Sequence, residues 1–279
     1  MQEYATCAKK RGQADPRGRR GADENVMVNY FDKPDYSVIV VGAGRGIGRA
    51  AALELAAQGL SVACFDSDGA SAEKVAAELK ARGNKAIAAQ LDVIDVGSIR
   101  PAIEAAAKAF GRIDALVNCA GITGRTNIPA GEVDLEDFER VYQVNLRGAL
   151  LLSQAVLPNM LQRRYGRLLH IASIAGKEGN AGMTAYSATK AGLIGMVKSM
   201  AKDYVEQGIT VNALAPAVIR TPMVDALPQA TVDYMTAKIP MRRCGELEEA
   251  ARMIAWIVSP ACSFTTGFTF DLSGGRATY

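Results

Sequence analysis

Residues 41–50, VGAGRGIGRA, carry a glycine at every second position from Gly42 to Gly48. The apolar run YSVIVV precedes these glycines, and an Ala-rich segment follows them. Between a buried strand and a helix, such a turn brings backbone N–H groups and the helix N-terminus close to a pyrophosphate. Side chains at these positions would hold the ligand away. The stretch therefore predicts the first strand–turn–helix unit of a dinucleotide-binding fold.

The spacing of the glycines departs from GxGxxG, because Ile47 occupies the sixth position. The pattern GxxxGxG fits instead, with Gly42, Gly46 and Gly48 as its glycines and Gly44 as an additional one. A glycine-rich turn alone can also serve a purely structural purpose. A P-loop is excluded, because GxxxxGK[ST] occurs nowhere in the chain.

Short apolar runs alternate with helix-like segments along most of the chain. The runs are residues 36–41, 61–65, 85–93, 113–118, 166–173, 209–216 and 267–273. The helix-like segments are Gly46–Gln58, Ser71–Arg82, Val96–Phe110, Leu135–Leu157, Thr184–Glu206 and Glu246–Val258. Runs rich in Val, Ile, Leu and Phe are typical of strands buried on both faces. We predict an α/β fold with a doubly wound, Rossmann-like parallel sheet of seven strands and helices on both faces.

Residues 1–33 differ from the rest of the chain. They are polar, rich in Gly and Arg, and lack apolar periodicity. The absence of an apolar stretch of about 7–15 residues argues against a secretory signal, and Asp15, Asp23 and Glu24 argue against a transit peptide. We expect a disordered N-terminal extension over residues 1–33 and one Rossmann-type domain over residues 34–279.

The composition limits the class of protein. The chain has 279 residues, of which 49% are hydrophobic, and a net charge of +3. This charge is too small to predict a nucleic-acid partner, and no apolar run approaches the roughly 18 residues of a membrane span. Five cysteines are scattered without a CxxC, and the single histidine belongs to no HExxH. We expect a metal-free cytoplasmic protein with reduced thiols and a small-molecule substrate, without a nucleic-acid or membrane partner.

Asp66 ends the second predicted strand, 18 residues after Gly48. In dinucleotide-binding folds, an acid about 20 residues beyond the glycine turn binds the adenosine ribose hydroxyls. Asp68 can cap the following helix, which leaves Asp66 for the ligand. A 2′-phosphate would meet like charge at Asp66, so we expect NAD as the cofactor. Arg45 in the glycine turn can contact a phosphate of either cofactor, which keeps NADP open.

Ser173 ends another predicted strand, and Tyr186 and Lys190 lie four positions apart in a predicted helix. This spacing places the phenol and the ammonium group on one helix face. A cation about 4 Å away, at an effective dielectric constant of about 20, would lower the pKa of the phenol by about three units. Burial acts in the opposite direction. We expect the cation, helped by the positive nicotinamide ring of the cofactor, to prevail, so that Tyr186 exchanges a proton near neutral pH. The alternative is a solvated pair on a surface helix.

Together these residues resemble the short-chain dehydrogenase/reductase family. The resemblance covers about residues 35–279 and rests on GAGRGIG at Gly42–Gly48, Asp66, LDV at Leu91–Val93, NCAG at Asn118–Gly121, Asn145 in VNL, Ser173, YSATK at Tyr186–Lys190, APAVIRTPM at Ala215–Met223 and a terminal SGG. It implies an NAD(P)-dependent oxidoreductase that acts on CH–OH groups, and a homotetramer. Two long predicted helices carry apolar and small residues that agree with burial between subunits, including Ala149, Leu150, Ala191, Gly192 and Gly195.

The resemblance also implies roles for individual residues. Tyr186 would be the acid/base, Ser173 would hydrogen-bond the reacting oxygen, and Lys190 would bind the nicotinamide ribose and lower the pKa of Tyr186. Asn145 would support a proton relay to Lys190 through water. Asp92 and Val93 would contact the adenine, Asn118 the adenine-ribose side of the site, and Thr221 the nicotinamide or phosphate region. The other implied cofactor-binding residues are Gly42, Arg45, Gly46, Ile47, Gly48, Asp66, Tyr186 and Lys190.

Three positions depart from the family pattern. Val41 replaces a usual Thr, Cys119 a usual second Asn, and Ala217 a usual Gly. The first two remove side-chain hydrogen bonds and the third removes loop freedom, but none is one of the four implied catalytic residues. His170 lies within a predicted strand, where we expect a buried, hydrogen-bonded core residue and not a catalytic one.

The loop at residues 176–183, GKEGNAGM, is polar, and its Lys177, Glu178 and Asn180 could reach a ligand with several hydroxyls. The final residues, FTFDLSGGRATY, resemble those of sugar-acid members of the family, notably 2-keto-3-deoxy-sugar-acid 4-dehydrogenases of the L-fuconate and L-rhamnonate pathways. The expected reaction is oxidation of the C4 hydroxyl. A substrate carboxylate would need a cationic partner, for which the candidates are Arg125, Lys177, Arg220 and Arg276.

Two other functions remain open at this point. One is an NADPH-dependent 3-ketoacyl (acyl carrier protein) reductase, whose pocket would be expected to carry more apolar residues in the loop after Ser173. The other is a non-catalytic, cofactor-sensing binding protein. Such a protein would typically lack one of Ser173, Tyr186 or Lys190, and this chain has all three.

Overall fold

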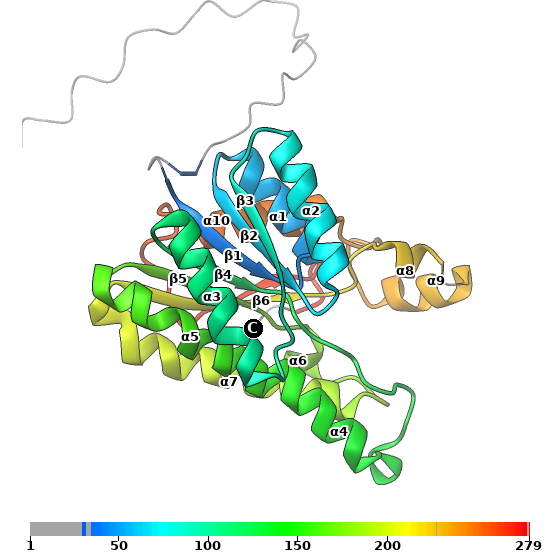
Figure 1. Cartoon of the computed structure of the whole chain (residues 1–279). Helices are drawn as coiled ribbons and strands as arrows, with labels where there is room; N and C mark the ends of the chain where they lie inside the picture. Colours follow the sequence, from blue (N-terminus) through cyan, green and yellow to red (C-terminus); the bar gives the residue numbers. More distant parts are fainter. Residues whose placement is uncertain (1–29, 32–34, 227, 278) are drawn as a thin grey trace, which may run out of the picture.

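Seven strands form one sheet in the order β3-β2-β1-β4-β5-β6-β7 (Figure 1). The structure, a computed structural model, describes residues 30–31, 35–226, 228–277 and 279. The strands are β1 (Ser37–Val41), β2 (Ser61–Asp66), β3 (Ala86–Gln90), β4 (Ala115–Asn118), β5 (Gly166–Ile171), β6 (Ile209–Pro216) and β7 (Thr269–Leu272). Every neighbouring pair is parallel. The predicted doubly wound, seven-stranded sheet is confirmed.

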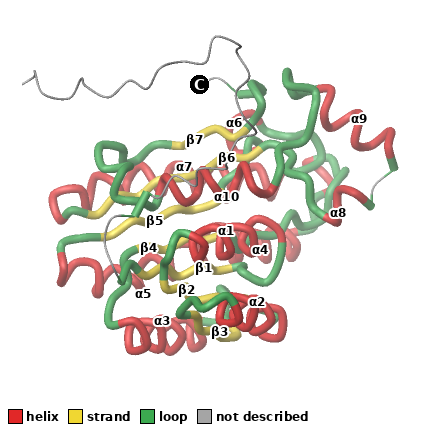
Figure 2. The backbone as a smooth tube through the Cα atoms, turned by 90° about the horizontal axis from the view of Figure 1, so that it is seen from above, coloured by secondary structure: helices red, strands yellow, loops and turns green. Residues whose placement is uncertain are grey.

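Burial explains why the strands read as continuous apolar runs. All residues of β1, β4, β5 and β6 are buried. Strands β3 and β7, which lie at the two edges of the sheet (Figure 2), are only partly buried. A central parallel strand is covered on both faces, so neither set of alternating side chains reaches water.

Two layers of helices provide this cover (Figure 1). One apolar cluster joins the sheet to α1 (Gly46–Ala57), α2 (Gly69–Ala81) and α10 (Leu247–Ile257). A second cluster on the other face joins it to α3 (Val96–Phe110), α5 (Gly148–Arg163) and α7 (Thr184–Tyr204). In the described part of the chain, no helix has both the length and the apolar character needed to span a bilayer.

The segment expected as a single helix at Leu135–Leu157 is divided into three. It consists of α4 (Leu135–Tyr142), a π-helical segment (Gln143–Arg147) and α5, which continues to Arg163. The expectation of one uninterrupted helix was wrong, because apolar periodicity does not reveal the wider turn of a π segment. This interruption matters for the site, since it contains Asn145.

Several short elements were not predicted. They are α6 (Ala175–Glu178), α8 (Pro222–Asp225), α9 (Gln229–Ala237) and 3₁₀ turns at Ala130–Glu132 and Val205–Gln207. Helices α8 and α9 project from the body of the molecule (Figure 1). The third strand ends at Gln90, three residues before the predicted end at Val93, so Asp92 and Val93 lie in a loop.

Two residues of the expected N-terminal extension contact the domain. The Phe31 ring is buried and lies 4.9 Å from that of Tyr36, and the Tyr30 N–H donates to Gln58 Oε1 at 3.1 Å. Tyr30 and Phe31 therefore belong to the folded unit. The rest of the expected extension, residues 1–29 and 32–33, lies outside the described residues, as does Pro34.

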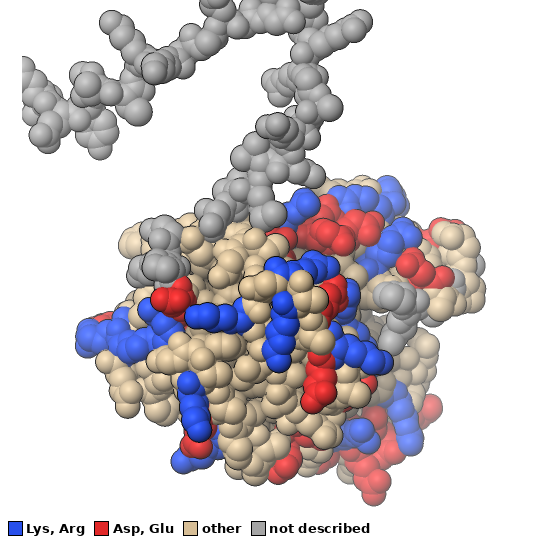
Figure 3. Space-filling view, turned by 45° about the horizontal axis from the view of Figure 1, so that its top comes forward, with Lys and Arg blue, Asp and Glu red and all other residues tan. Residues whose placement is uncertain are grey.

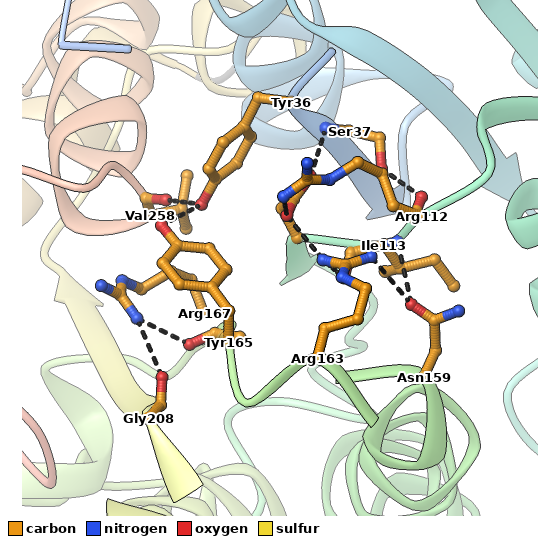
Figure 4. A network of polar contacts seen from close by, with 12 residues as sticks. Tyr36, Ser37, Arg112, Ile113, Asn159, Arg163, Tyr165, Arg167, Gly208 and Val258 are labelled. Carbon is orange, nitrogen blue, oxygen red and sulfur yellow. Dashed lines mark hydrogen bonds and ion pairs between the residues drawn. The ribbon is translucent and has the colours of Figure 1, made fainter. Parts of the chain in front are cut away.

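A polar network lies at the end of the sheet where the strands begin (Figure 4). Its centre is the fully buried Asp114, which accepts hydrogen bonds from Arg112 Nε at 2.7 Å, Arg163 Nη2 at 2.7 Å and Ser37 N at 2.9 Å. These contacts tie β1, β4 and α5 together. Their loss would leave a buried carboxylate unpaired, which typically costs about 3–5 kcal/mol.

The surface charges are mixed. On the face shown in Figure 3, basic and acidic side chains are interspersed. Several exposed or half-buried charges form ion pairs, such as Arg82–Glu78 at 2.6 Å.

Candidate active site

The strand order reverses beside β1, which lies between β2 and β4. In a doubly wound sheet, ligands bind in the crevice that this reversal opens at the carboxyl ends of the strands. A cleft of about 380 Å³ lies there. Eight predicted cofactor-binding residues line it, namely Gly42, Arg45, Ile47, Gly48, Asp66, Asp92, Val93 and Thr221.

Other lining residues were not predicted. Ser67, Ile94 and Ala120 adjoin predicted positions, so the motifs could have indicated them. Arg140 and Val144 come from α4 and the π segment. No local pattern marks those two, because only the tertiary fold brings these elements to the cleft.

The glycine turn is packed too closely for side chains. A Cβ atom at Gly48 would lie 2.0 Å from the carbonyl oxygen of Gly42, and Gly42 itself has a left-handed φ of 78°. At Gly44, a Cβ atom would lie 2.8 Å from that of Ser71. The turn therefore presents bare backbone at the N-terminus of α1, which is the arrangement that fits a pyrophosphate.

Asp66 is held in place by the same turn. Its Oδ2 accepts from the Gly44 N–H at 2.9 Å, and its Oδ1 accepts from the Asp68 N–H at 3.0 Å. Asp68 caps α2 as expected, accepting from Ser71 N at 3.1 Å. The sequence had suggested that Asp66 is free for the ligand. In the structure its carboxylate instead has protein partners. Each carboxylate oxygen keeps a lone pair for a ribose hydroxyl, so the residue still fits its predicted role.

Asn118 does not present its side chain to the cleft. It is buried at the end of β4, where Oδ1 accepts from Ala120 N at 3.1 Å and Nδ2 lies 3.2 Å from His170 Nδ1. Its contacts instead fix the turn that carries Cys119 and Ala120, both of which line the cleft. Burial raises the pKa of the Cys119 thiol to about 12, so this thiol is neutral.

His170 is a buried core residue, as predicted. Its Nδ1 faces the Asn118 amide, and its Nε2 lies 3.1 Å from Ser153 Oγ, which donates to Ala149 O at 2.8 Å. These partners suit a neutral ring protonated on Nε2. Burial, with a smaller effect from the charge of Lys190, lowers the pKa of His170 to about 4.

Ser173, Tyr186 and Lys190 come together beside the cleft. Ser173 follows β5, and its Oγ accepts from Ala175 N at 3.1 Å. Tyr186 lies in the first turn of α7, half-buried and hydrogen-bonded to the Ser173 side chain. One turn later, the buried Lys190 places Nζ 5.7 Å from the Tyr186 ring centroid and donates to Ile171 O at 2.7 Å.

In the protein alone, burial is the largest influence on the pKa values of Tyr186 and Lys190. Burial raises the pKa of Tyr186, and the hydrogen bond from Ser173 only partly offsets it. Burial also lowers the pKa of Lys190 to about 8. The prediction that the cation, helped by a positive nicotinamide ring, outweighs burial stays a prediction, since in the protein alone Lys190 Nζ lies over the Tyr186 ring and also donates a hydrogen bond to the Ile171 carbonyl. A second positive charge is needed to bring the phenol toward neutral pH.

Asn145 joins this cluster from the π segment. Its side chain exchanges two hydrogen bonds with the backbone of Ile122, each 2.9 Å long, and donates to Thr189 Oγ1 at 3.2 Å. A Cβ atom on Gly121 would lie 3.2 Å from Lys190 Nζ and 3.3 Å from Asn145 Oδ1. Gly121 also lines the cleft, so Lys190 and Asn145 lie directly beside it, and Tyr186 and Ser173 adjoin Lys190.

The polar loop at residues 176–183 faces the end of the chain. Lys177 pairs with Asp271 at 2.8 Å, and Glu178 pairs with Arg276 at 2.8 Å. Asn180 also accepts from Arg276. The expectation that these loop side chains are available to a ligand was wrong, because residues distant in sequence already bind them. The other candidate cations contact acids too: Arg125 contacts Asp134, and Arg220 contacts Asp225 and Glu246.

Comparison with known proteins places this geometry in a family. The sequence pattern of the family described as short chain dehydrogenase matches residues 36–231. A 2-dehydro-3-deoxy-L-rhamnonate dehydrogenase (NAD(+)) of Sphingomonas sp. (strain SKA58) is 44% identical over 241 residues, which cover 86% of this chain and 95% of the relative. A 3-oxoacyl-(acyl-carrier-protein) reductase of Synechocystis sp. (strain ATCC 27184 / PCC 6803 / Kazusa) is 40% identical over 243 residues, covering 86% and 96%.

Solved structures agree with the sequence relatives. An NAD+-bound xylitol dehydrogenase has a TM-score of 0.83 and 30% identity, covering 88% of this chain and 100% of that chain. The crystal structure of gox2181 has a TM-score of 0.85 and 29% identity, covering 89% and 98%. The fold and the matches define an oxidoreductase that acts on CH–OH groups. The chain belongs to the short-chain dehydrogenase family.

Proposed function

We propose that the protein is an NAD-dependent dehydrogenase that oxidises the C4 hydroxyl of a 2-keto-3-deoxy-L-sugar acid. The observation that carries the proposal is the convergence of Ser173, Tyr186 and Lys190 beside a cleft that contains Asp66. The relative named for 2-dehydro-3-deoxy-L-rhamnonate, at 44% identity, supports the substrate class.

Different residues would bind different parts of the cofactor. Asp66 would hold the adenosine ribose, the glycine turn the pyrophosphate, and Lys190 the nicotinamide ribose. Thr221, whose methyl group lies 4.0 Å from the position of a Cβ on Gly46, would close the cleft over the turn. When bound, NAD⁺ supplies the acceptor for the hydride that leaves the substrate carbon.

Proton transfer falls to Tyr186. Ser173 Oγ and Tyr186 Oη would bind the substrate hydroxyl, and the phenolate form of Tyr186 would take its proton as the carbonyl forms. Lys190 favours the phenolate through its positive charge, and Asn145 holds the wall of the cleft at Ile122 beside it. For each substrate oxidised, Tyr186 Oη would thus accept one proton, and the hydride would leave to the bound cofactor.

A second candidate is an NADPH-dependent 3-ketoacyl (acyl carrier protein) reductase. The 40% identical reductase favours it, as do Arg45 and Arg140, two cations that line the cleft near Asp66. Asp66 argues against the extra phosphate, since its carboxylate would repel it. A non-catalytic binding protein is disfavoured, because Ser173, Tyr186 and Lys190 are all present and assembled.

We further propose a cytoplasmic homotetramer. The thiols of Cys64, Cys119, Cys244 and Cys262 are unpaired, which suits a reducing compartment. Residues 1–26 lie outside the described residues and are proposed to have no part in catalysis. A variant that begins at Met27 is expected to keep the activity and the number of subunits, and a large loss of activity would overturn this.

The substrate proposal is tested with purified protein and both cofactors. We expect 2-keto-3-deoxy-L-rhamnonate or 2-keto-3-deoxy-L-fuconate to be oxidised with a higher kcat/KM than simple alcohols, free sugars or steroids. The same panel includes 3-ketoacyl thioesters, assayed in the reductive direction. If a thioester or steroid is turned over far more efficiently than both sugar acids, the substrate class is wrong, although the role of Tyr186 would stand.

A further inference from the structure

The end of β7 and the segment after it lie against the loop between Ser173 and Tyr186. Residues 271–277 and 279 supply one partner, and α6 with the loop after it supplies the other. This loop connects the two groups that bind the reacting oxygen, so its conformation sets their separation. We call residues 271–277 and 279 the terminal segment.

The first contact encloses Lys177. Its Nζ donates to both oxygens of Asp271, at 3.0 and 2.8 Å, and to the backbone oxygen of Tyr279. The Tyr279 hydroxyl donates back to Lys177 O at 2.5 Å, and the ammonium lies 4.8 Å from the centre of the Tyr279 ring. Only 8% of the Lys177 side chain remains exposed.

The second contact runs through Arg276 toward α7. Arg276 Nε donates to Glu178 Oε2 at 2.9 Å, and Nη2 donates to Asn180 Oδ1 at 3.0 Å. The N–H of Asn180 in turn donates to Ser187 Oγ at 3.1 Å, in the residue next to Tyr186. The Arg276 side chain is only 9% exposed. The terminal segment therefore reaches the first turn of α7 through an unbroken chain of hydrogen bonds.

The loop needs such support. Gly179 and Gly182 both adopt left-handed φ angles, of 73° and 72°, and glycine backbones lose the most entropy when they are fixed. At the other end, a Cβ on Gly176 would lie 2.6 Å from the carbonyl carbon of Lys190, so the loop is packed directly on α7. A small shift of the loop would move Ser173 relative to Tyr186.

Stability alone does not explain these ion pairs. Partly buried pairs recover little more than their desolvation cost, and apolar residues of similar size often serve stability better. A fixed geometry is what such a pair provides. The Arg243–Glu249 pair differs from these two pairs, because it is exposed and only joins the turn before α10 to the first turn of that helix.

We propose that the terminal segment positions Ser173 and Tyr186 for catalysis through the ion pairs Lys177–Asp271 and Arg276–Glu178. The inference rests on the proposed function, since it takes these two residues as the binding site of the reacting oxygen. It also assigns Lys177 and Arg276 a positioning role and removes them from the candidates for the substrate carboxylate.

The test exchanges the charges of one pair. Glu178→Arg and Arg276→Glu should each lower kcat by about 10–100-fold, the cost of a misplaced reacting group, without a comparable rise in the KM for NAD⁺. The double variant restores the ion pair in reverse, and kcat should recover by at least about tenfold. If Arg276 bound the substrate carboxylate directly, the double variant would stay impaired, because a carboxylate at position 276 would repel the substrate, and the proposal would be overturned.

A second measurement does not depend on turnover. In the protein without cofactor, amide hydrogen exchange over residues 174–189 should speed up in each single variant and return toward the wild-type rate in the double variant. Arg163→Gln is the control, since it weakens the buried Asp114 network at the opposite edge of the sheet. It should lower the melting temperature without changing exchange in the loop or kcat.

Milder changes cover the case in which a charge reversal fails to fold. Glu178→Gln and Arg276→Gln should show the same effects at smaller size, and unchanged exchange and kcat in both would overturn the proposal. Failure of the proposed function has a separate signature: Tyr186→Phe would keep its turnover, whereas the exchange results concern only the loop and the terminal segment.

Discussion

Burial sets the ionisation of the two residues that would move the proton. It raises the pKa of Tyr186 and lowers the pKa of Lys190 to about 8, so at neutral pH the phenol is neutral and the ammonium is still mostly charged. The two interact, so any measured pKa belongs to the pair. The sequence identified both residues from their spacing but could not give the balance of burial and charge, which depends on side chains packed from β5 and α7.

The pH dependence of turnover follows from this balance. Oxidation requires the phenolate of Tyr186, whose fraction increases up to tenfold per pH unit below its pKa. We expect kcat/KM for oxidation to rise with pH through the neutral and mildly alkaline range. The reverse reduction, which requires the protonated phenol, should not rise over the same range. Initial rates in both directions test this, and an oxidation profile independent of pH would contradict it.

Replacement of Tyr186 by Phe should remove nearly all turnover. General acid–base catalysis typically contributes about 10²–10⁴-fold, and among the described residues no tyrosine or histidine lines the cleft to replace the phenol. Cofactor affinity should change little, because the ring itself is retained. The kcat is measured with the best substrate and NAD⁺ binding by fluorescence titration. A variant with a tenth of the wild-type kcat would show that another group moves the proton.

Asp66 should give NAD a preference of at least about 100-fold over NADP in kcat/KM, equivalent to about 2.7 kcal/mol. A 2′-phosphate would meet the carboxylate, which the Gly44 and Asp68 N–H groups hold in place. Asp66→Asn keeps the shape and removes the charge, so its preference for NAD should fall by at least about tenfold. Comparable efficiency of the wild-type protein with both cofactors would contradict this prediction.

At the level of elements, the regular strands and helices were predictable and the connections between them were not. The strands are buried on both faces, and this burial appears directly in their composition. The π segment around Asn145 could not be recognised from the sequence, since its residues keep the amphipathic pattern of a helix through the wider turn. The polar loop at residues 176–183 was predicted to face a ligand. Its partners Asp271 and Arg276 could not be recognised from the sequence, because they lie about a hundred residues away.

The contact between β5 and α5 gives a prediction for stability. His170 has a folded-state pKa of about 4, against 6.5 for an ordinary histidine. Between these values the unfolded chain binds a proton that the folded chain does not, so stability is lost as the pH falls from about 6.5 to about 4. The difference corresponds to about 3 kcal/mol.

The chain's single histidine makes this prediction testable. Free energies of unfolding in urea, measured at pH 7 and pH 5 at one protein concentration, should differ more for the wild-type protein than for His170→Gln. Glutamine retains an acceptor and donors for Asn118 and Ser153 but does not titrate. An equal loss of stability in the two proteins would show that carboxylates alone cause the acid dependence.

At the scale of the whole molecule, the two ends of the sheet serve different purposes. The Asp114 network closes the edge where the strands begin, and the cleft with Ser173 and Tyr186 lies where they end. Destabilising changes at the Asp114 network should therefore leave the chemistry at the cleft largely intact. The sequence predicted the catalytic end from its motifs, whereas Asp114 and Arg163 carried no recognisable signal.

Two separate apolar surfaces bear on the number of subunits. On the outer sides of α5 and α7, Leu150, Ala191 and Gly195 are exposed, and a Cβ on Gly195 would meet open space. Ala149, also named for this role from the sequence, is instead buried in the core. Edge strand β7 lies beside Phe268, which is 53% exposed and packs edge-to-face against Phe270, with the ring centroids 4.9 Å apart. One two-fold interface would give a dimer, and two different ones give a closed tetramer.

We therefore expect light scattering at micromolar concentration to give four times the subunit mass of 29.5 kDa. Phe268→Glu should halve this mass, because burying a charge in one interface breaks it while the helical interface on α5 and α7 persists. Gly195→Glu should also give a dimer, through the other surface. Tyr234→Glu, a matched change at an exposed aromatic residue of the projecting α9, should leave the tetramer intact. A monomeric wild-type protein would contradict the proposal, and a dimer that only one of the two substitutions dissociates would limit it to a single interface.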